Sequence, residues 1–98
     1  MLDRIEGLER EFLDVEARLA DPDVFADQDK YRELAKRHHE LAAIVSRSTE
    51  LRQRTEDAAT AREMLTDLAG DDREMMRTEA AEADADIERL TGELQYLL

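Results

Sequence analysis

Residues 76–97 read MRTEAAEADADIERLTGELQYL, and their apolar residues recur at intervals of four and three. This spacing places them on one face of an α-helix, whereas a β-strand would need strict alternation. We therefore predict a helix over about residues 72–97 whose narrow apolar stripe packs against another helix. The stripe consists of Met76, Ala80, Ala83, Ile87, Leu90, Leu94 and Leu97.

A tight link, Gly70-Asp71-Asp72, precedes this helix. Upstream of it, residues 28–69 contain neither proline nor glycine, which predicts one long helix over about that range. Gly70 stands where a left-handed glycine commonly follows a helix end. Asp71 and Glu74 have the spacing of a capping box that would open the next helix. So short a link makes the two helices pack antiparallel, as a coiled-coil-like hairpin.

The apolar face of the long helix changes direction along its length. Between its early and late residues the stripe rotates by more than the ~20° per heptad of ordinary supercoiling. We expect the first half to face one helix and the second half another, with residues 47–57 as the polar crossover. The early set is Tyr31, Leu34, His38, Leu41 and Val45, and the late set is Leu51, Ala58, Ala61, Leu65 and Leu68.

A first helix is predicted over about residues 3–20, because Ile5, Leu8, Phe12, Val15 and Leu19 form another heptad stripe. Asp3 and Glu6 have capping-box spacing at its start. Pro22 should end it, since the residue before a proline avoids the α region. Val24 and Phe25 should hold the following turn against the helices, and Asp27 should cap the long helix.

From these lengths we predict an all-α fold. Residues 1–98 would form a single helical domain, an elongated antiparallel three-helix bundle with a long central helix. The first helix would lie along the central helix as far as about residue 46, and the last helix back to about residue 44, at ~1.5 Å per residue.

The composition limits the class of protein. Of the 98 residues 41% are charged and 4% are aromatic, and there is no cysteine. No apolar run is long enough to cross a bilayer, and the first twenty residues lack the apolar segment of a signal peptide. We therefore expect a cytoplasmic protein with no membrane partner. The absence of cysteine excludes disulfides and cysteine-based zinc sites.

The formal net charge is −12, which repels the phosphates of nucleic acids, so we expect no direct nucleic-acid binding by this domain. Residues 79–88 carry five acidic residues and no base. They are interpreted either as a solvated helix face or as a surface that meets a basic protein.

No pattern in the chain indicates catalysis. His38 and His39 point about 100° apart on a helix and cannot share a metal ion, so we expect His38 in the seam and His39 in solvent. There is no glycine-rich phosphate loop and no nucleophile motif. We therefore expect a protein that is not an enzyme, with no cofactor and no metal, and we assign no partner-binding residue. Met64, Met75 and Met76 are interpreted either as core filling or as an apolar docking surface.

Residues 19–45, LADPDVFADQDKYRELAKRHHELAAIV, resemble the bacterial class I peptide chain release factors. Within them, residues 27–34 are more similar to the branch of the family that reads UAA and UAG. Ala43 stands where many members have proline, which favours an unbroken central helix. The matching residues are Leu19 to Pro22, Val24, Asp27 to Asp29, Tyr31, Arg32, Leu34, Leu41, Ile44 and Val45.

The resemblance implies the N-terminal docking domain of a factor that directs peptidyl-tRNA hydrolysis at UAG and UAA. The family's Gly-Gly-Gln and codon-reading motifs are absent from this chain and belong to later domains, so no residue here inherits those roles. The implied partners are the factor-binding region of the ribosome, with stalk-base protein L11, and the class II release factor GTPase. Because Leu97 and Leu98 end the chain inside a heptad, we expect a domain excised from a longer protein. The alternative is a structural coiled-coil adaptor or homo-oligomerisation module unrelated to the ribosome.

Overall fold

A computed structural model describes all residues, 1–98, and contains helices but no strand, which confirms the all-α prediction. The helices are α1 (Leu2–Leu19), α2 (Pro22–Ala26), α3 (Gln28–Met64) and α4 (Gly70–Leu97). The chain forms two compact units, Met1–Ser46 and Arg47–Leu98. The boundary falls where the sequence predicts that the central helix changes its partner. None of the helices has a stretch apolar enough to span a membrane.

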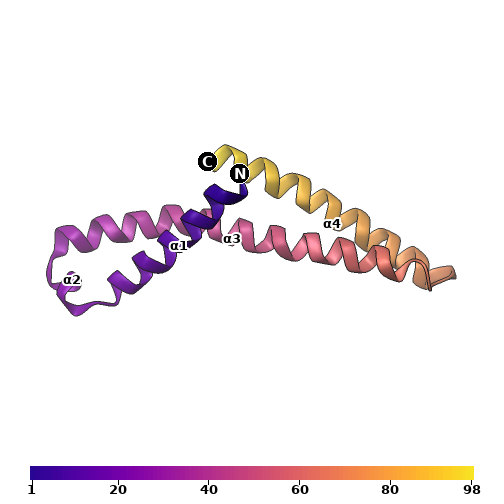
Figure 1. Ribbon diagram of the computed structural model, residues 1–98, viewed down its shortest axis with the longest axis horizontal. Coiled ribbons are helices and arrows are strands. Elements are labelled where there is room, and N and C mark those ends of the chain that lie inside the picture. The colour runs from indigo at the N-terminus through magenta and orange to yellow at the C-terminus, as the bar shows by residue number, and fades with distance from the viewer. The chain divides into compact units, whose positions relative to one another are not determined.

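The first unit, Met1–Ser46, is a hairpin of α1 and the beginning of α3, with α2 at the turn (Figure 1). Its heptad stripe supplies the core, because the buried positions recur at helical spacing. The ring of Phe12 stacks on that of His38, with centroids 4.7 Å apart. The buried apolar residues of this unit are Ile5, Val15, Val24, Leu41 and Ile44.

The connection between α1 and α3 is more ordered than the predicted turn. Pro22 ends α1 as expected, but it also opens the short helix α2 at the first position, where its missing N–H costs nothing. The Asp21 side chain accepts a hydrogen bond from the Asp23 N–H at 2.9 Å. Val24 is buried, whereas Phe25 is 60% exposed and packs edge-to-face with Tyr31, with ring centroids 5.4 Å apart.

The two predicted caps of this unit have different outcomes. The carboxylate of Asp27 accepts a hydrogen bond from the Lys30 N–H at 3.2 Å, so Asp27 caps α3 as predicted. Asp3 does not cap α1, because the helix begins at Leu2 with Met1 in the capping position. Asp3 instead lies in the first turn, where its charge favours the helix dipole.

The second unit, Arg47–Leu98, is a hairpin of the later part of α3 and α4 (Figure 1). The predicted stripe of α4 is largely confirmed, although Met76 and Ile87 are half-buried and Leu97 is 39% exposed. α3 continues through Ala43 without a break, as predicted. The buried residues of this unit are Ser48, Ala58, Ala61, Ala80, Ala83, Leu90 and Leu94.

The link between α3 and α4 corrects the sequence prediction. α3 ends at Met64 rather than near residue 69, because the Leu65 and Asp67 N–H groups bond three residues back in a turn. The Arg73 guanidinium then donates a hydrogen bond to the Leu65 carbonyl at 2.6 Å, so this carbonyl just after the end of α3 has a partner. Gly70 has a φ of +61°, the conformation that favours glycine, but it opens α4 instead of closing α3.

The predicted capping box at the start of α4 is wrong. α4 begins at Gly70 rather than near residue 72, and its capping residue is Ala69, which has no side-chain acceptor. Asp71 therefore lies inside the first turn, where a carboxylate favours the helix dipole without closing a hydrogen bond.

Candidate interaction surface

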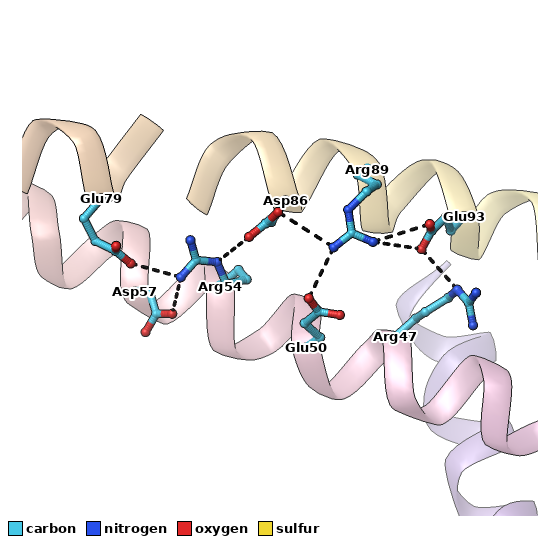
Figure 2. A network of polar contacts seen from close by, with 8 residues as sticks. All are labelled: Arg47, Glu50, Arg54, Asp57, Glu79, Asp86, Arg89 and Glu93. Carbon is cyan, nitrogen blue, oxygen red and sulfur yellow. Dashed lines mark hydrogen bonds and ion pairs between the residues drawn. The ribbon is translucent and has the colours of Figure 1, made fainter. Parts of the chain in front are cut away.

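Arg54 is the centre of a polar network in the second unit (Figure 2). Its side chain is only 18% exposed. Its Nη1 donates to Asp57 at 2.8 Å and to Glu79 at 2.9 Å, and its Nε donates to Asp86 at 2.8 Å. Glu79 and Asp86 are about two helical turns apart on α4. One guanidinium therefore joins α3 to a long segment of α4.

These contacts keep the groups around Arg54 charged. The hydrogen bonds with Asp57 and Glu79 raise the pKa of Arg54 above its ordinary value. A hydrogen bond from Gln53, followed by that from Arg54, lowers the pKa of Asp57. Charge-assisted hydrogen bonds of this kind are stronger than neutral ones, so the cluster links specific residues of the two helices.

The network continues toward the C-terminal end of α4 through Arg89 (Figure 2). Its Nη2 lies 3.2 Å from a carboxylate oxygen of Glu50 on α3, and its Nη1 lies 3.3 Å from Glu93. Glu93 in turn accepts from Arg47 of α3 at 3.1 Å. Positive and negative side chains thus alternate along the helix pair, which we call the charge ladder. Its members are Arg47, Glu50, Arg54, Asp57, Glu79, Asp86, Arg89 and Glu93.

The ladder decides between the two interpretations of the acidic stretch 79–88. Glu79 and Asp86 pair with Arg54, and Asp84 pairs with Arg62 of α3. Most of this acidic face therefore neutralises bases of its own chain. That arrangement favours the solvated helix face over a surface reserved for a basic partner.

Met64 and Met75, near the α3–α4 link, are exposed rather than core filling. Met64 is 44% exposed and Met75 is 60% exposed, while Met76 is half-buried. Met64 and Met76 line an open cleft of about 180 Å³ between α3 and α4, whose other walls carry carboxylates. Flexible, polarisable methionines are common at surfaces that accept varied partners. The remaining residues of the cleft are Glu56, Asp57, Thr60, Ala61 and Glu79.

In the first unit, polar contacts also join the helices. Arg37 of α3 donates from Nε and Nη2 to both carboxylate oxygens of Glu11 of α1, at 2.5 and 2.7 Å. This bidentate pair lowers the pKa of Glu11. His38 packs against Phe12 while His39 is exposed, as predicted. Nowhere do three or more histidine, aspartate or glutamate side chains converge in a way that could hold a metal ion.

Sequence reasoning missed the role of Arg54, which it placed only inside a polar crossover. A usable signal was present, because charged residues flank the predicted seam at heptad-like spacing on both helices. On α3 these are residues 47, 50 and 54, and on α4 they are residues 86, 89 and 93. Opposite charges at such flanking positions commonly pair across two packed helices.

Comparison with known proteins gives one consistent family. The PCRF domain matches residues 8–98. Peptide chain release factor 1 of Maridesulfovibrio salexigens is 37% identical over 98 residues, which are the whole of this chain and 28% of that protein. The corresponding protein of Pelobacter propionicus is 38% identical, again over the whole chain and 27% of the relative. That of Alkaliphilus oremlandii is 35% identical over 100 residues, covering the whole chain and 28% of the relative. The chain thus spans little more than a quarter of these relatives, and it matches their N-terminal part. No solved structure gives a significant match.

Proposed function

Because the chain belongs to the PCRF domain family and matches the N-terminal part of bacterial peptide chain release factor 1 proteins, we propose that it serves translation termination as a non-catalytic docking domain. The match over residues 8–98 to one domain, which is a small part of the relatives, is the observation that carries this proposal. Peptidyl-tRNA hydrolysis and codon reading would then be performed by parts of the factor outside this chain. The resemblance of residues 27–34 to the UAG- and UAA-reading branch supports those codons as its targets.

The chemistry of the side chains supports a scaffold role. The groups whose pKa values are shifted by their partners, such as Glu11, Arg54 and Asp57, all act in contacts between or within helices. They stabilise the two hairpins, and none is held ready beside a nucleophile.

The proposed partners are the ribosome, at its factor-binding region with stalk-base protein L11, and the class II release factor GTPase. The exposed Met64 and Met75 supply an apolar contact of the kind that docking requires. The carboxylates around them would favour a partner surface that carries lysine or arginine.

The alternative of a coiled-coil oligomer has less support. The heptad stripe that would drive association between chains is used inside this one, since Ala83, Leu90 and Leu94 are all 0% exposed. A second copy would have to use a different face.

A peptide-release assay with three proteins tests the proposal: the 98-residue chain, the factor without it, and the whole factor, each with and without the GTPase. We expect no release by the chain alone and release by the factor without it, but poor recycling of that shortened factor by the GTPase. Release by the chain alone would overturn the proposal. So would normal recycling of the shortened factor, because the domain would then have no role.

Point variants of the whole factor refine this test. Met64→Ser combined with Met75→Ser should weaken recycling without changing the rate of release. The control is Leu13→Ser, which changes an exposed apolar residue of the first unit, 67% exposed, and should behave as the wild type. Equal effects of the two changes would argue against docking through the methionines.

A further inference from the structure

The alanine part of the α3–α4 seam defines only weakly how far α4 is displaced along α3. Near the link, the seam is built from Ala58 and Ala61 on α3 and from Ala80 and Ala83 on α4, all less than 8% exposed. The members of each pair are about one helical turn apart. When α4 is displaced by one turn, one of its alanines reaches the position that the other has left, and identical methyl groups discriminate weakly there. The second alanine position then receives Met76 or Ile87, which is the only apolar discrimination in this part of the seam.

The charge ladder distinguishes these arrangements sharply. Glu50 faces Arg89 at 3.2 Å, and the residues one turn to either side of Arg89 on α4 are acidic, Asp86 and Glu93. A slide of α4 by one turn in either direction would place a carboxylate against Glu50. Like charges in direct opposition destabilise a helix pair, so the ladder penalises both slid forms.

Arg54 adds attraction between the helices in the observed register, because it pairs with two acidic residues of α4. It is the least exposed side chain of the ladder's ion pairs, and it holds Glu79 and Asp86 together. A slide of about 5.4 Å, one turn, would break both contacts with α4. In one direction it would bring Arg89 toward the position of Asp86, where two guanidinium groups would repel each other.

We propose that Arg54, together with the Glu50–Arg89 pair, determines the register of α4 along α3. Partly buried polar groups in a helical seam often contribute little net stability while excluding alternative alignments. The register matters at the end of the hairpin, because it determines where Met75 of α4 lies with respect to Met64 of α3. This inference does not depend on the proposed function.

The absence of cysteine allows the register to be measured directly on the 98-residue chain. Cysteines introduced at two exposed positions that lie far apart along the hairpin axis, Ala59 on α3 and Gln95 on α4, carry spin labels whose separation is measured by double electron–electron resonance. With the ladder intact we expect one narrow distance. In Arg54→Met/Asp86→Leu, which replaces the charges by apolar groups, we expect helicity to persist but the distance to broaden or split by about 5 Å.

The control is Arg77→Met/Glu74→Leu, which removes an ion pair within α4 whose side chains are 59% and 67% exposed. It should leave the single distance unchanged. If the apolar variant does not fold, Arg54→Gln takes its place with the same expectation. A single unchanged distance in the folded Arg54 variant would overturn the proposal, because the apolar seam alone would then define the register.

Discussion

The two units of this chain are both helical hairpins, but different forces hold them together. Met1–Ser46 buries branched apolar side chains from each of its helices, including Ile5, Leu41 and Ile44. In Arg47–Leu98 the buried residues of α3 are two alanines and a serine, and the only large buried side chains are two leucines of α4. Ion pairs between helices are correspondingly more numerous in the second unit, where several link α3 to α4.

The two units show that the interactions that stabilise a helical hairpin differ from those that define the alignment of its helices. Burial of apolar surface contributes about 25 cal/mol per Å², so a methyl group contributes far less than the side chain of leucine or isoleucine. Partly exposed ion pairs contribute roughly 0–1 kcal/mol each and cannot replace that loss. The charge ladder instead favours one register of α4 along α3 over the others. The first unit thus relies on shape and burial, and the second relies more on charge order.

The largest expected effect is the loss of a buried leucine. Leu41→Ala in the first unit and Leu90→Ala in the second should each lower the free energy of unfolding by about 2–5 kcal/mol, because both side chains are fully buried. Urea denaturation followed by circular dichroism measures this loss. Leu13→Ala, at a position 67% exposed, is the control and should change it by less than about 0.5 kcal/mol. A small effect of Leu90→Ala would mean that α4 is not anchored by its stripe.

A smaller effect is expected from enlarging the alanine seam. Ala83 is 0% exposed, so Ala83→Leu would push the helices apart and should cost about 1–3 kcal/mol. Ala85→Leu places the same side chain at an exposed position of the same helix and should be nearly neutral. Thermal unfolding of the two variants compares them. A neutral Ala83→Leu would show that α3 and α4 are not in close contact there.

The smallest expected effect is a change in how the stability of the fold depends on pH under acidic conditions. The pKa of Glu11 lies below its ordinary value of 4.5 because Arg37 binds its charged form. The pKa of Asp57 lies below its ordinary value of 3.8 because Gln53, followed by Arg54, donates hydrogen bonds to its charged form. A carboxylate with a lowered pKa stabilises the fold above its unfolded pKa, and this contribution disappears as the pH falls through the folded value. Glu11→Gln should therefore flatten the decline of stability below about pH 4.5, most clearly for the first unit.

Asp57→Asn should likewise flatten the decline of stability with falling pH, but in the second unit. Residue-resolved hydrogen exchange measures the stability of the two units separately. An unaltered pH profile in both variants would show that neither carboxylate is linked to folding.

Much of this architecture could be predicted from spacing alone. Heptad stripes predicted the helices and most of their buried faces, and Pro22 predicted the end of α1, because both signals are local. The short helix α2 and the early end of α3 at Met64 were missed. The first depends on Asp21, whose side chain accepts a hydrogen bond from the Asp23 N–H at the start of α2. The second depends on a turn at Leu65 whose carbonyl accepts from Arg73, a contact that forms only in the folded hairpin.

The role of Arg54 was missed for a related reason. Five acidic residues between 79 and 88 could each have been its partner, and the choice requires the register of the two helices. The proposed caps Asp3 and Asp71 failed because aspartate also favours the first turn of a helix, so its presence does not decide which residue is the cap.

The most direct test of the contrast between the units is residue-resolved hydrogen exchange of the 98-residue chain in sodium chloride. Raising the salt from about 0.1 M to about 1 M shortens the screening length from about 10 Å to about 3 Å. The repulsion between distant acidic residues is already screened at the lower concentration, so the main effect of the added salt is to weaken the ion pairs. We predict that amides around Arg54 and Asp86 lose protection while those around Val15 and Leu41 retain it. Equal loss in both units, or greater loss in Met1–Ser46, would contradict the conclusion that the second hairpin relies more on its ion pairs than the first does.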